Sequence, residues 1–445
     1  GQTTLSFTDK YTGQSTELFL SIQAFKTHDL GIDGEIYTKN VIRNAGDLNG
    51  DGFDEVLMGL PRASLNAYRS GLVALYKGSE NGLMLEPWMV FGQEMTSKTY
   101  FGEDLLVADF NQDGRIDLGV IAQSSDIGGT NKGAFLIYSG RQGDPPFEED
   151  PFIITGKDRF DQLASATACD INGDGLLDLS LGSPYADDDS IEGDAGRNVG
   201  AINIHYGTSS GYGIEPDIQR FGRRLNAQNE WTPTDYLQMG EHLASGDLNG
   251  DGNCDIVAST AQAGPIGEER DTSDYKGMDA LFLGSSNGPS LRPDKIIGLN
   301  ETDKIANLGE QIAIADIDAD GQDELFIASR RQDHLNGTNN GAVFGFDDID
   351  FTTNTPFIDA YFADWQLYGD NNDLFGSGLV LGDYDSDGAI DVVVGAPYRS
   401  VNGTRDGGIL VFDNETLLNS MAPIYAESAL VSFGNHNQNY SHFGQ

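Results

Sequence analysis

Six copies of a nine-residue acidic pattern hold the residues whose types and spacing point most directly to chemistry. Each copy has the form Asp-x-(Asp/Asn)-x-Asp-Gly-x-x-(Asp/Glu), and successive copies begin 61 to 77 residues apart. Side-chain oxygens at positions 1, 3, 5 and 9, with a backbone carbonyl at position 7, are ligands that a hard cation such as Ca²⁺ prefers. Because six copies at near-regular spacing are no coincidence, the pattern predicts about six Ca²⁺ sites.

The predicted ligands occupy positions 1, 3, 5, 7 and 9 of each copy, and position 7 contributes its backbone carbonyl. They are Asp47, Asn49, Asp51, Phe53 and Glu55; Asp109, Asn111, Asp113, Arg115 and Asp117; Asp170, Asn172, Asp174, Leu176 and Asp178; Asp247, Asn249, Asp251, Asn253 and Asp255; Asp316, Asp318, Asp320, Gln322 and Glu324; and Asp383, Asp385, Asp387, Ala389 and Asp391. Glycine at position 6 allows a sharp turn where a Cβ atom would obstruct. The alternative is an Asp- and Gly-rich hairpin turn without a metal. We disfavour it because carboxylates packed into nine residues repel one another unless a cation lies between them.

The segments around each copy indicate β-strands. Short runs rich in β-branched residues follow the loops, as in residues 56–61 and 392–397, and predict buried strands. Strand-like segments also precede the loops, with clear examples beginning at Phe101, Met239, Leu308 and Phe375. The loop matches an EF-hand loop over its first six positions, but its closing acid stands at position 9 rather than 12, and it joins two strands. A third strand follows each pair, and because several alternate apolar with small or polar residues, we expect these strands to be half-exposed.

The composition excludes several classes of function. Acidic residues outnumber basic ones by 70 to 26 among 445 residues, which gives a net charge of −44. This charge excludes a nucleic-acid partner and docking onto anionic lipid, since both require clustered Lys and Arg. No apolar run approaches the roughly 20 residues of a membrane span, so direct membrane insertion is not expected. The 57 Gly residues indicate many tight turns and short strands, and two Cys exclude a disulfide framework.

The repeated unit resembles the FG-GAP repeat, which combines a Phe-Gly pair, a strand, a cation loop and an apolar strand ending in Gly-Ala-Pro. Phe375-Gly376 with Gly395-Ala396-Pro397 is the fullest match, whereas Met or Leu replaces the Phe in two other copies. The chain therefore looks like the β-propeller of integrin α subunits, and the resemblance covers residues 41–411. In such propellers each unit of about 60–70 residues is a four-stranded blade.

The resemblance implies an all-β fold: a seven-bladed β-propeller of four-stranded blades with Ca²⁺-binding loops, forming a single domain over residues 1–445. Blades start near residues 41, 101, 160, 239, 308 and 375. The strand-like segments within residues 1–36 contain no acidic loop, so we expect them to complete a closing blade with residues 421–445. Six blades, or a fragment of a longer protein, is the alternative. The first residue is Gly1 rather than Met, which indicates a processed chain or a fragment.

The loops between the second and third strands of each blade are the candidate recognition surface. The acidic loops join strands 1 and 2, whereas these longer loops lie at the opposite strand ends and carry aromatic, Arg and acidic residues. We select Tyr185, Arg197 and Arg399 as ligand-contacting residues, and we expect their replacement by Ala to cost little stability. The resemblance to integrin propellers implies that this side of the blades binds ligand.

The sequence therefore predicts an extracellular module, secreted or at the cell surface, that is stabilised by Ca²⁺. Its expected partner is a protein or glycan at a cell surface or in the matrix, together with other domains of a longer chain. No convergent set of catalytic residues stands out, so we expect no enzyme. Two alternatives stay open: a glycan-binding lectin or accessory domain of a secreted polysaccharide-active enzyme, and a polysaccharide lyase on a propeller scaffold.

Overall fold

A computed structural model describes most of the chain between residues 41 and 434, with two short N-terminal segments. The described residues are 5–8, 15–18, 41–64, 67–84, 86–92, 94–191, 196–225, 230–232, 236–260, 277–299, 306–334, 337–384, 387–401, 404–405, 407–420, 423–429 and 431–434. The chain divides into two compact units. Unit 1 comprises Gly1–Ala168, Leu176–Ala186 and Asn203–Gln219; unit 2 comprises Cys169–Gly175, Asp187–Ile202 and Arg220–Gln445.

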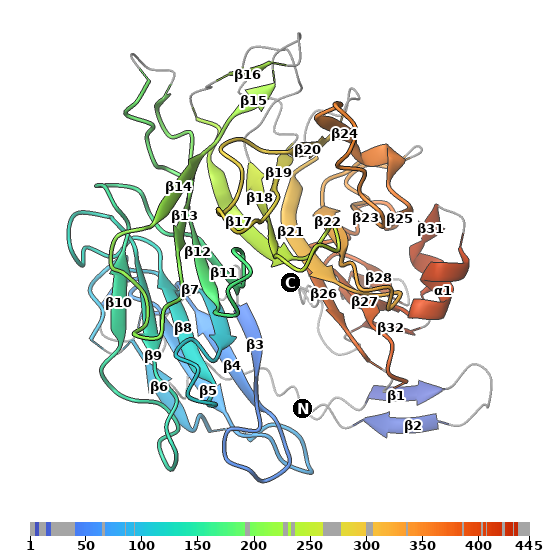
Figure 1. Cartoon of the computed structure of the whole chain (residues 1–445). Coiled ribbons are helices and arrows are strands. Elements are labelled where there is room, and N and C mark those ends of the chain that lie inside the picture. The colour runs from blue at the N-terminus through green and yellow to red at the C-terminus, as the bar shows by residue number, and fades with distance from the viewer. Residues whose placement is uncertain are drawn as a thin grey trace. The chain divides into compact units, whose positions relative to one another are not determined.

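The described residues form six blade-like sheets, each with four strands that neighbour one another in chain order, and two of these sheets have a fifth strand at the edge (Figure 1). The first three contain β3 (Val41–Gly46), β4 (Glu55–Leu60), β5 (Leu72–Tyr76) and β6 (Met89–Phe91); β7 (Phe101–Ala108), β8 (Asp117–Ala122), β9 (Ala134–Tyr138) and β10 (Phe152–Thr155); and β11 (Ser165–Cys169), β12 (Asp178–Ser183), β13 (Ala201–His205) and β14 (Ile218–Phe221). The last three contain β17 (Met239–Gly246), β18 (Asp255–Thr260), β19 (Met278–Phe282) and β20 (Lys295–Gly298); β21 (Leu308–Ala315), β22 (Glu324–Ser329), β23 (Ala342–Phe346) and β25 (Trp365–Tyr368); and β26 (Gly378–Gly382), β27 (Asp391–Ala396), β30 (Gly408–Phe412) and β32 (Val431–Gly434).

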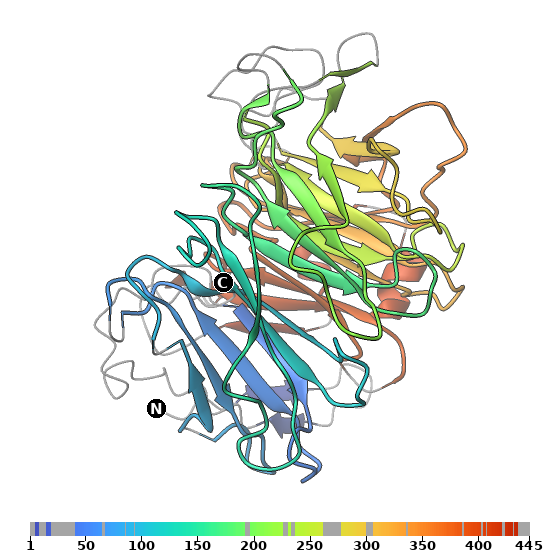
Figure 2. The same cartoon turned by 60° about the vertical axis from the view of Figure 1, so that its left-hand side comes forward.

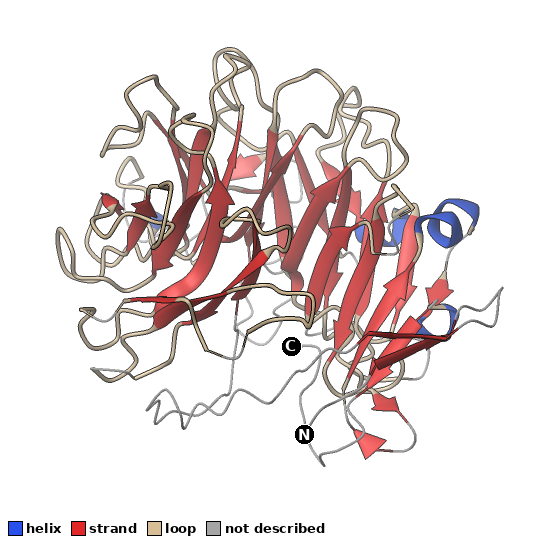
Figure 3. Cartoon of the chain, turned by 90° about the horizontal axis from the view of Figure 1, so that it is seen from below, coloured by secondary structure: helices blue, strands red, loops and turns tan. Residues whose placement is uncertain are grey.

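The remaining elements are short, and strands dominate the described residues (Figure 3). Three two-stranded sheets pair β1 (Leu5–Thr8) with β2 (Ser15–Leu18), β15 (Arg224–Leu225) with β16 (Trp231–Thr232), and β28 (Ser400–Val401) with β29 (Thr404–Arg405). The helical elements are η2 (Ala360–Phe362), α1 (Asn414–Asn419) and η3 (Ala426–Ser428). Two added strands, β24 (Phe357–Asp359) and β31 (Ile424–Tyr425), lie at sheet edges. Within the described part of the chain, no helix is both long and apolar enough to cross a bilayer.

The second and third strands of the blades are the most buried elements. All side chains of β8, β12, β18 and β22 are buried, as the apolar runs after the loops predict. The third strands β5, β9, β13, β19 and β23 are also buried along their whole length, so the prediction of half-exposed third strands is wrong. Their small residues make room for large neighbours instead of facing solvent. A Cβ atom at Gly345 of β23, for example, would lie 2.6 Å from the Phe326 ring and 2.9 Å from the Trp365 indole.

Each unit buries apolar side chains between adjacent sheets. In unit 1, Leu57 and Val73 of the first sheet pack in one cluster with Phe101 and Leu118 of the second, and these two sheets lie side by side (Figure 2). In unit 2, the fourth and fifth sheets share another cluster, in which Leu281 meets other fully buried aliphatic residues. Since both faces of a sheet are covered in this way, the interior strands read as nearly continuous apolar runs.

The Phe-Gly positions connect one blade to the next. Phe101 forms a parallel bridge with Gly71, which directly precedes the third strand of the preceding blade, and Phe375 bridges Gly341 in the same way. A Cβ atom at Gly71 would collide with the Phe101 backbone, and Gly71 also has a left-handed φ of +77°. Glycine is therefore required there for both space and backbone conformation.

The described residues form six blades, so the predicted count of seven is wrong and the six-blade alternative holds. The closing blade predicted from residues 1–36 and 421–445 falls mostly outside the described residues and stays a prediction. Strands β1 and β2 pair with each other, whereas β32 completes the sixth sheet and β31 adds a parallel edge strand to the fifth. Strand β24 adds a corresponding parallel edge strand to β20 of the fourth sheet. The other residues of 1–36 and 421–445, and the loop 261–276, lie outside the described residues.

Candidate metal centre

The aspartate at position 1 organises each acidic loop. In the first loop, Asp47 Oδ1 accepts the backbone N–H of Asp51 at 3.0 Å and Asp47 Oδ2 accepts that of Gly52 at 2.8 Å. The N–H of Gly52 is the largest cause of a lowered pKa of Asp47. The same pair of bonds recurs in the other five loops, at Asp109, Asp170, Asp247, Asp316 and Asp383, with distances of 2.7 to 3.2 Å.

Positions 3 and 5 continue this pattern as a ladder of side-chain-to-backbone hydrogen bonds. Asn49 Oδ1 accepts the N–H of Asp51 at 2.9 Å, and Asp51 Oδ1 accepts the N–H of Phe53 at 3.0 Å. The position-3 bond recurs in loops two to five and the position-5 bond in loops two, four, five and six. Each carboxyl or amide is thus folded back over its own loop, and its orientation is fixed by the backbone before any ligand binds.

Glycine at position 6 is required because the backbone there has a positive φ, and not because a side chain would collide with a neighbour. Gly52 and Gly388 have φ values of +90° and +92°, yet a Cβ atom at either would meet nothing within 4 Å. The chain also turns left-handed at position 4, where the first loop has Gly50 at +76° but the fifth has Ala319 at +62°. A side chain in this region costs about 1–2 kcal/mol.

We therefore expect Ala319→Gly to raise the free energy of unfolding by about 1 kcal/mol, because it removes this backbone strain. Equilibrium denaturation in excess Ca²⁺ is the measurement. Ala389→Gly is the matched control: it lies in the sixth loop at a residue without a positive φ, where glycine should destabilise slightly or leave stability unchanged. Equal effects of the two substitutions would contradict the strain argument.

The acid at position 9 is the first residue of the second strand and is buried in every blade. Glu55, Asp117, Asp178, Asp255, Glu324 and Asp391 are each at most 2% exposed. In the second blade, Asp117 Oδ2 accepts the N–H of Phe110 at 2.9 Å and Oδ1 accepts the N–H of Gly140 at 2.6 Å. Gly140 lies two residues beyond the end of the third strand at Tyr138, so one carboxylate joins the acidic loop to the end of that strand. The second bond recurs at Gly78, Gly207, Gly284 and Asn414.

Glycine after the third strand makes this junction sterically possible. A Cβ atom at Gly140 would collide with the backbone carbonyl oxygen of Ile116, the residue just before the position-9 acid. A Cβ atom at Gly78, Gly207 or Gly284 would collide in the same way with the carbonyl oxygen of the residue just before the position-9 acid of its own blade. Sequence reasoning missed this second role of the position-9 acid, although a Gly stands at the end of four of the six third strands and was a usable signal.

We expect Gly140→Ala to lower the free energy of unfolding by about 2–3 kcal/mol, because the steric overlap displaces the backbone N–H that donates to the buried Asp117 carboxylate. Gly382→Ala in β26 serves as the control, since a Cβ atom there would meet nothing within 4 Å. Denaturant titration of both variants measures the difference. A Gly140 variant as stable as the Gly382 variant would show that the junction relaxes without cost.

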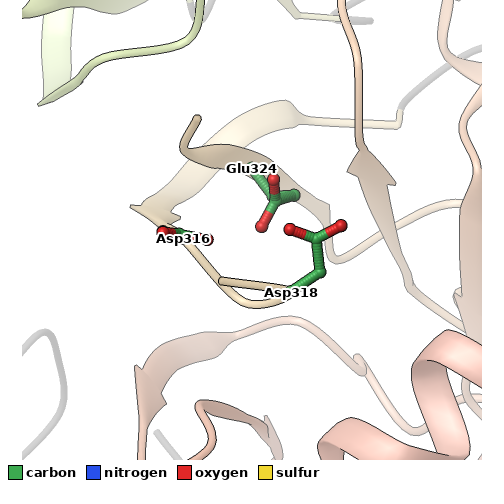
Figure 4. A group of neighbouring side chains, drawn as sticks. All are labelled: Asp316, Asp318 and Glu324. Atoms are coloured by element: carbon green, nitrogen blue, oxygen red, sulfur yellow. The ribbon is translucent and has the colours of Figure 1, made fainter. Parts of the chain in front are cut away.

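The fifth loop is the most acidic of the fully described loops and brings three carboxylates together. Oxygen atoms of Asp316, Asp318 and Glu324 all lie within 4.8 Å of one another, and Figure 4 shows the Asp318 and Glu324 carboxylates facing each other. Ca²⁺ binds oxygen at about 2.3–2.6 Å, so oxygens on opposite sides of the ion lie about 5 Å apart. Burial raises the pKa of Glu324 to about 7, chiefly by desolvating its charge. Spacing, donor type and the uncompensated charge all fit a Ca²⁺ ion.

The other loops differ from the fifth mainly at position 3. Asn takes the place of Asp there in the first four loops, which leaves fewer carboxylates per loop. Burial nevertheless raises the pKa of the position-9 acids Glu55, Asp117 and Asp255, that of Asp255 to about 7. A bound cation would lower these pKa values again by favouring the charged form. Asp385, at position 3 of the sixth loop, lies outside the described residues.

The position-7 residues have contacts that the sequence did not predict. Their backbone N–H groups donate to the position-5 acids in the first, second, fourth, fifth and sixth loops. Three of their side chains contact acids as well. Arg115 pairs with Asp113 at 3.3 Å, the Asn253 amide donates to Asp251, and Gln322 Nε2 donates to Asp348 at 2.7 Å. Their predicted role as carbonyl ligands stays a prediction.

The three predicted ligand-contacting residues lie in different surroundings. Tyr185 is 36% exposed, and Arg197 is also exposed. Arg399 is only 12% exposed, and its Nη1 lies 2.9 Å from Asp373 Oδ2 and 3.0 Å from Asp370 Oδ2. Asp373 is itself buried, and desolvation raises its pKa despite the neighbouring guanidinium. Arg399 thus has a structural partner, contrary to the expectation that its loss would cost little stability.

We expect Arg399→Ala to destabilise the chain by about 2–3 kcal/mol, because it leaves the Asp373 carboxylate buried without its cation. Arg141→Ala is the control, since the Arg141–Glu148 pair is exposed and 3.8 Å long and should contribute under about 1 kcal/mol. The measurement is the denaturation midpoint near neutral pH. Equal midpoints for both variants would show that the Arg399 ion pairs contribute no more to stability than an exposed surface pair.

Known proteins resemble this chain over its repeats. The FG-GAP repeat family model matches residues 163–201, which contain the third acidic loop. The chain is 29% identical over 177 residues to integrin alpha-8 of Gallus gallus, a match that covers 39% of this chain and 15% of integrin alpha-8. It is 23% identical over 404 residues to phosphatidylinositol-glycan-specific phospholipase D of Rattus norvegicus, covering 83% of this chain and 45% of that protein. The chain thus spans less than half the length of either relative.

These relatives correct one prediction. The sequence led us to expect no enzyme, but a relative named as a phospholipase aligns with 83% of the chain, so that exclusion is wrong. Among solved structures, rhamnogalacturonan lyase YesW matches 85% of this chain and 63% of its own, at 13% identity and a TM-score of 0.37, a likeness too distant to bear on function.

Six four-stranded sheets carry an acidic loop at the same place, and Phe-Gly positions bridge successive blades. The repeat model and the integrin match agree with this architecture. The chain thus contains a segment that matches the FG-GAP repeat, within a series of four-stranded blades that each carry an acidic loop.

Proposed function

We propose that this chain is a Ca²⁺-stabilised recognition module of a longer extracellular protein. The observation that carries the proposal is the repeated ladder of preorganised oxygen donors, which in the fifth loop places three carboxylates within 4.8 Å. When bound, Ca²⁺ would supply the positive charge that holds these carboxylates together. Cation loops of extracellular modules work at the high Ca²⁺ concentrations found outside cells.

The recognition surface in this proposal consists of the loops between strands 2 and 3 and between successive blades. Tyr185 and Arg197 lie in such a loop, and neither belongs to an acidic loop. The partner class is a protein or glycan at a cell surface or in the matrix. Integrin alpha-8 supports this part of the proposal as a relative.

A second candidate is a propeller that serves as one part of a longer enzyme. The alignment with the phospholipase over 83% of the chain favours it. In both candidates the propeller depends on Ca²⁺, and they differ in what the complete protein does. Assaying the longest natural form of the protein for phospholipase and polysaccharide-cleaving activity separates them.

The test of the leading proposal combines ion binding with ligand screening. Isothermal titration calorimetry should give several Ca²⁺ ions per chain, and Asp316→Ala should remove one of them. A cell-adhesion assay and a glycan array should yield a ligand whose binding falls at least tenfold in Tyr185→Ala or Arg197→Ala, with melting temperatures unchanged. Asp387→Ala should show the reverse, a loss of stability with little direct effect on binding. A ligand that coordinates the loop cations directly would contradict the proposal.

A further inference from the structure

The two cysteines of the chain lie where two consecutive acidic loops meet. Cys169 ends β11 directly before the third loop, and Cys254 is position 8 of the fourth loop. Both belong to unit 2, both are half-buried, and both are thiols in this structure. The backbone N–H of Cys254 donates to Asp170 O at 2.9 Å. Cys254 is therefore held beside the residue that follows Cys169.

The fourth and fifth loops meet in the same way as the third and fourth. The N–H of Asp323, position 8 of the fifth loop, donates to Asp247 O, also at 2.9 Å. In both pairs of loops, a Cβ atom at the position-4 glycine would lie 2.4 or 2.8 Å from the position-7 side chain of the next loop: Gly173 from Asn253, and Gly250 from Gln322. These two shared contacts show that the two pairs of loops are arranged alike.

Where the fourth and fifth loops meet, the position-8 side chain points at the residue that precedes the other loop. Asp323 Oδ2 accepts the N–H of Asp247 at 2.7 Å, and a Cβ atom at Gly246 would lie 3.3 Å from Asp323 Cγ. Cys Sγ, like Asp Cγ, is one bond from its Cβ atom. In a disulfide, a Cβ atom lies about 3 Å from the sulfur of the partner, because the S–S bond is about 2.0 Å long. Cys169 and Cys254 occupy the equivalent positions, so their sulfurs are close enough for a disulfide to form.

The chain also has room for a cysteine before the third loop, whereas it requires glycine before the fourth. A Cβ atom at Gly246 would lie only 2.3 Å from Cγ2 of Ile314, which stands two residues before the fifth loop. The residue two positions before the fourth loop is Ser245, whose side chain is smaller and unbranched. Cys169 therefore fits beside Cys254 without the collision that excludes a side chain from residue 246.

We propose that Cys169 and Cys254 are a modification site at which oxidation forms a disulfide that fastens the third acidic loop to the fourth. Disulfides form and persist in oxidising compartments such as the extracellular space, and a low-molecular-weight disulfide such as glutathione disulfide is a sufficient oxidant. One cysteine attacks it, which gives a mixed disulfide and one glutathione, and the second cysteine attacks the mixed disulfide and releases another glutathione. The protein loses two electrons and two protons, which the two glutathione molecules carry away. The inference does not depend on which ligand the chain recognises.

Oxidation of the whole chain tests the assignment. The reduced chain is incubated with glutathione disulfide in excess Ca²⁺, and the products are identified by intact mass and by non-reducing peptide mapping. We expect a monomer that has lost two hydrogen atoms and carries one link, between Cys169 and Cys254. Cys254→Ser should stop at the mixed disulfide and keep one glutathione. Cys169→Ser combined with Thr167→Cys is the matched control. Its thiol lies two residues, or about 7 Å, further back on the same face of β11, so the link should form at least tenfold more slowly.

The disulfide should also raise the melting temperature by about 3–5 °C above that of the reduced chain, because it joins residues 85 positions apart. Two retained glutathiones, a disulfide-linked dimer, or two thiols that still react with iodoacetamide would each overturn the proposal. Equal rates of linking in the parent chain and in the control would also overturn it, since the cysteines would then meet through chain flexibility. A linked chain with an unchanged melting temperature would contradict the fastening of the two loops.

Discussion

Removal of Ca²⁺ is expected to lower the melting temperature of this chain by about 10–20 °C. An ion present at 100 times its dissociation constant stabilises the folded state by about 2.7 kcal/mol, so six such ions would contribute about 16 kcal/mol. A chain of 445 residues unfolds with an entropy of about 0.9 kcal/mol/K, which converts that sum into the expected shift. The buried acids at position 9 also favour a large shift. They are part of the second strands, so losing the cation would destabilise the blades as well as the loops.

Scanning calorimetry in excess chelator and in excess Ca²⁺, at matched ionic strength, measures this shift. Mg²⁺ is the control ion, because it requires a near-ideal octahedral shell at about 2.0–2.1 Å and should not restore the full melting temperature. If the melting temperature is the same in chelator and in Ca²⁺, the predicted Ca²⁺ sites and the proposed function that depends on them are both contradicted.

Asp279→Val is expected to stabilise the chain at neutral pH by as much as about 4 kcal/mol. Asp279 lies in β19 on the same strand face as Leu281, is fully buried, and neither of its carboxyl oxygens has a hydrogen-bond partner. The third-strand residues at the same place in other blades are aliphatic, for example Val73 and Val343. Burial raises the pKa of Asp279 well above its usual range. The upper limit of the gain is the free energy needed to protonate an ordinary aspartic acid at pH 7. That pH lies about three units above the usual Asp pKa of about 3.9, and each unit is worth about 1.36 kcal/mol.

The pH dependence of this effect has a definite sign. A raised folded-state pKa means that the folded chain holds a proton that the unfolded chain releases, so stability falls as pH rises above the unfolded pKa of about 3.9. The advantage of Asp279→Val should therefore be small near pH 4 and grow toward pH 7. Denaturant titrations at several pH values measure it, with Asp150→Val at an exposed residue as the control. An advantage that is constant with pH would show that packing, and not the proton, accounts for the gain.

Much of the fold follows from the repeat. Loops that join strands and buried second strands both arise within one unit of sequence, where local pattern and burial agree. The third strands were misjudged because alternation with small residues looks the same whether the small residue faces water or a neighbouring sheet. At Gly345, the neighbours are Phe326 and Trp365, which no local pattern reveals.

The candidate metal residues were identifiable for the same reason, since their spacing is local. The second role of the position-9 acids was not, because the partner N–H comes from the end of the third strand, 23 to 29 residues further on. The ion pairs of Arg399 were not predicted, because Asp370 and Asp373 lie in the connection between blades. Asp279 breaks the apolar pattern of its strand without a compensating partner, so sequence rules predict an aliphatic residue there.

The parallel edge strand β24 sets an order of events during synthesis. The fourth sheet contributes β20, but Phe357–Asp359 pairs with its outer edge only after about 60 further residues have been made, at about 5–20 residues per second. For several seconds the nascent chain thus presents an unpaired strand edge, which is the kind of surface that recruits other strands. The fifth sheet repeats the situation, since Ile424–Tyr425 covers β25. A chain whose synthesis stops after β20 but before β24, or after β25 but before β31, would keep such an unpaired edge and should aggregate through it.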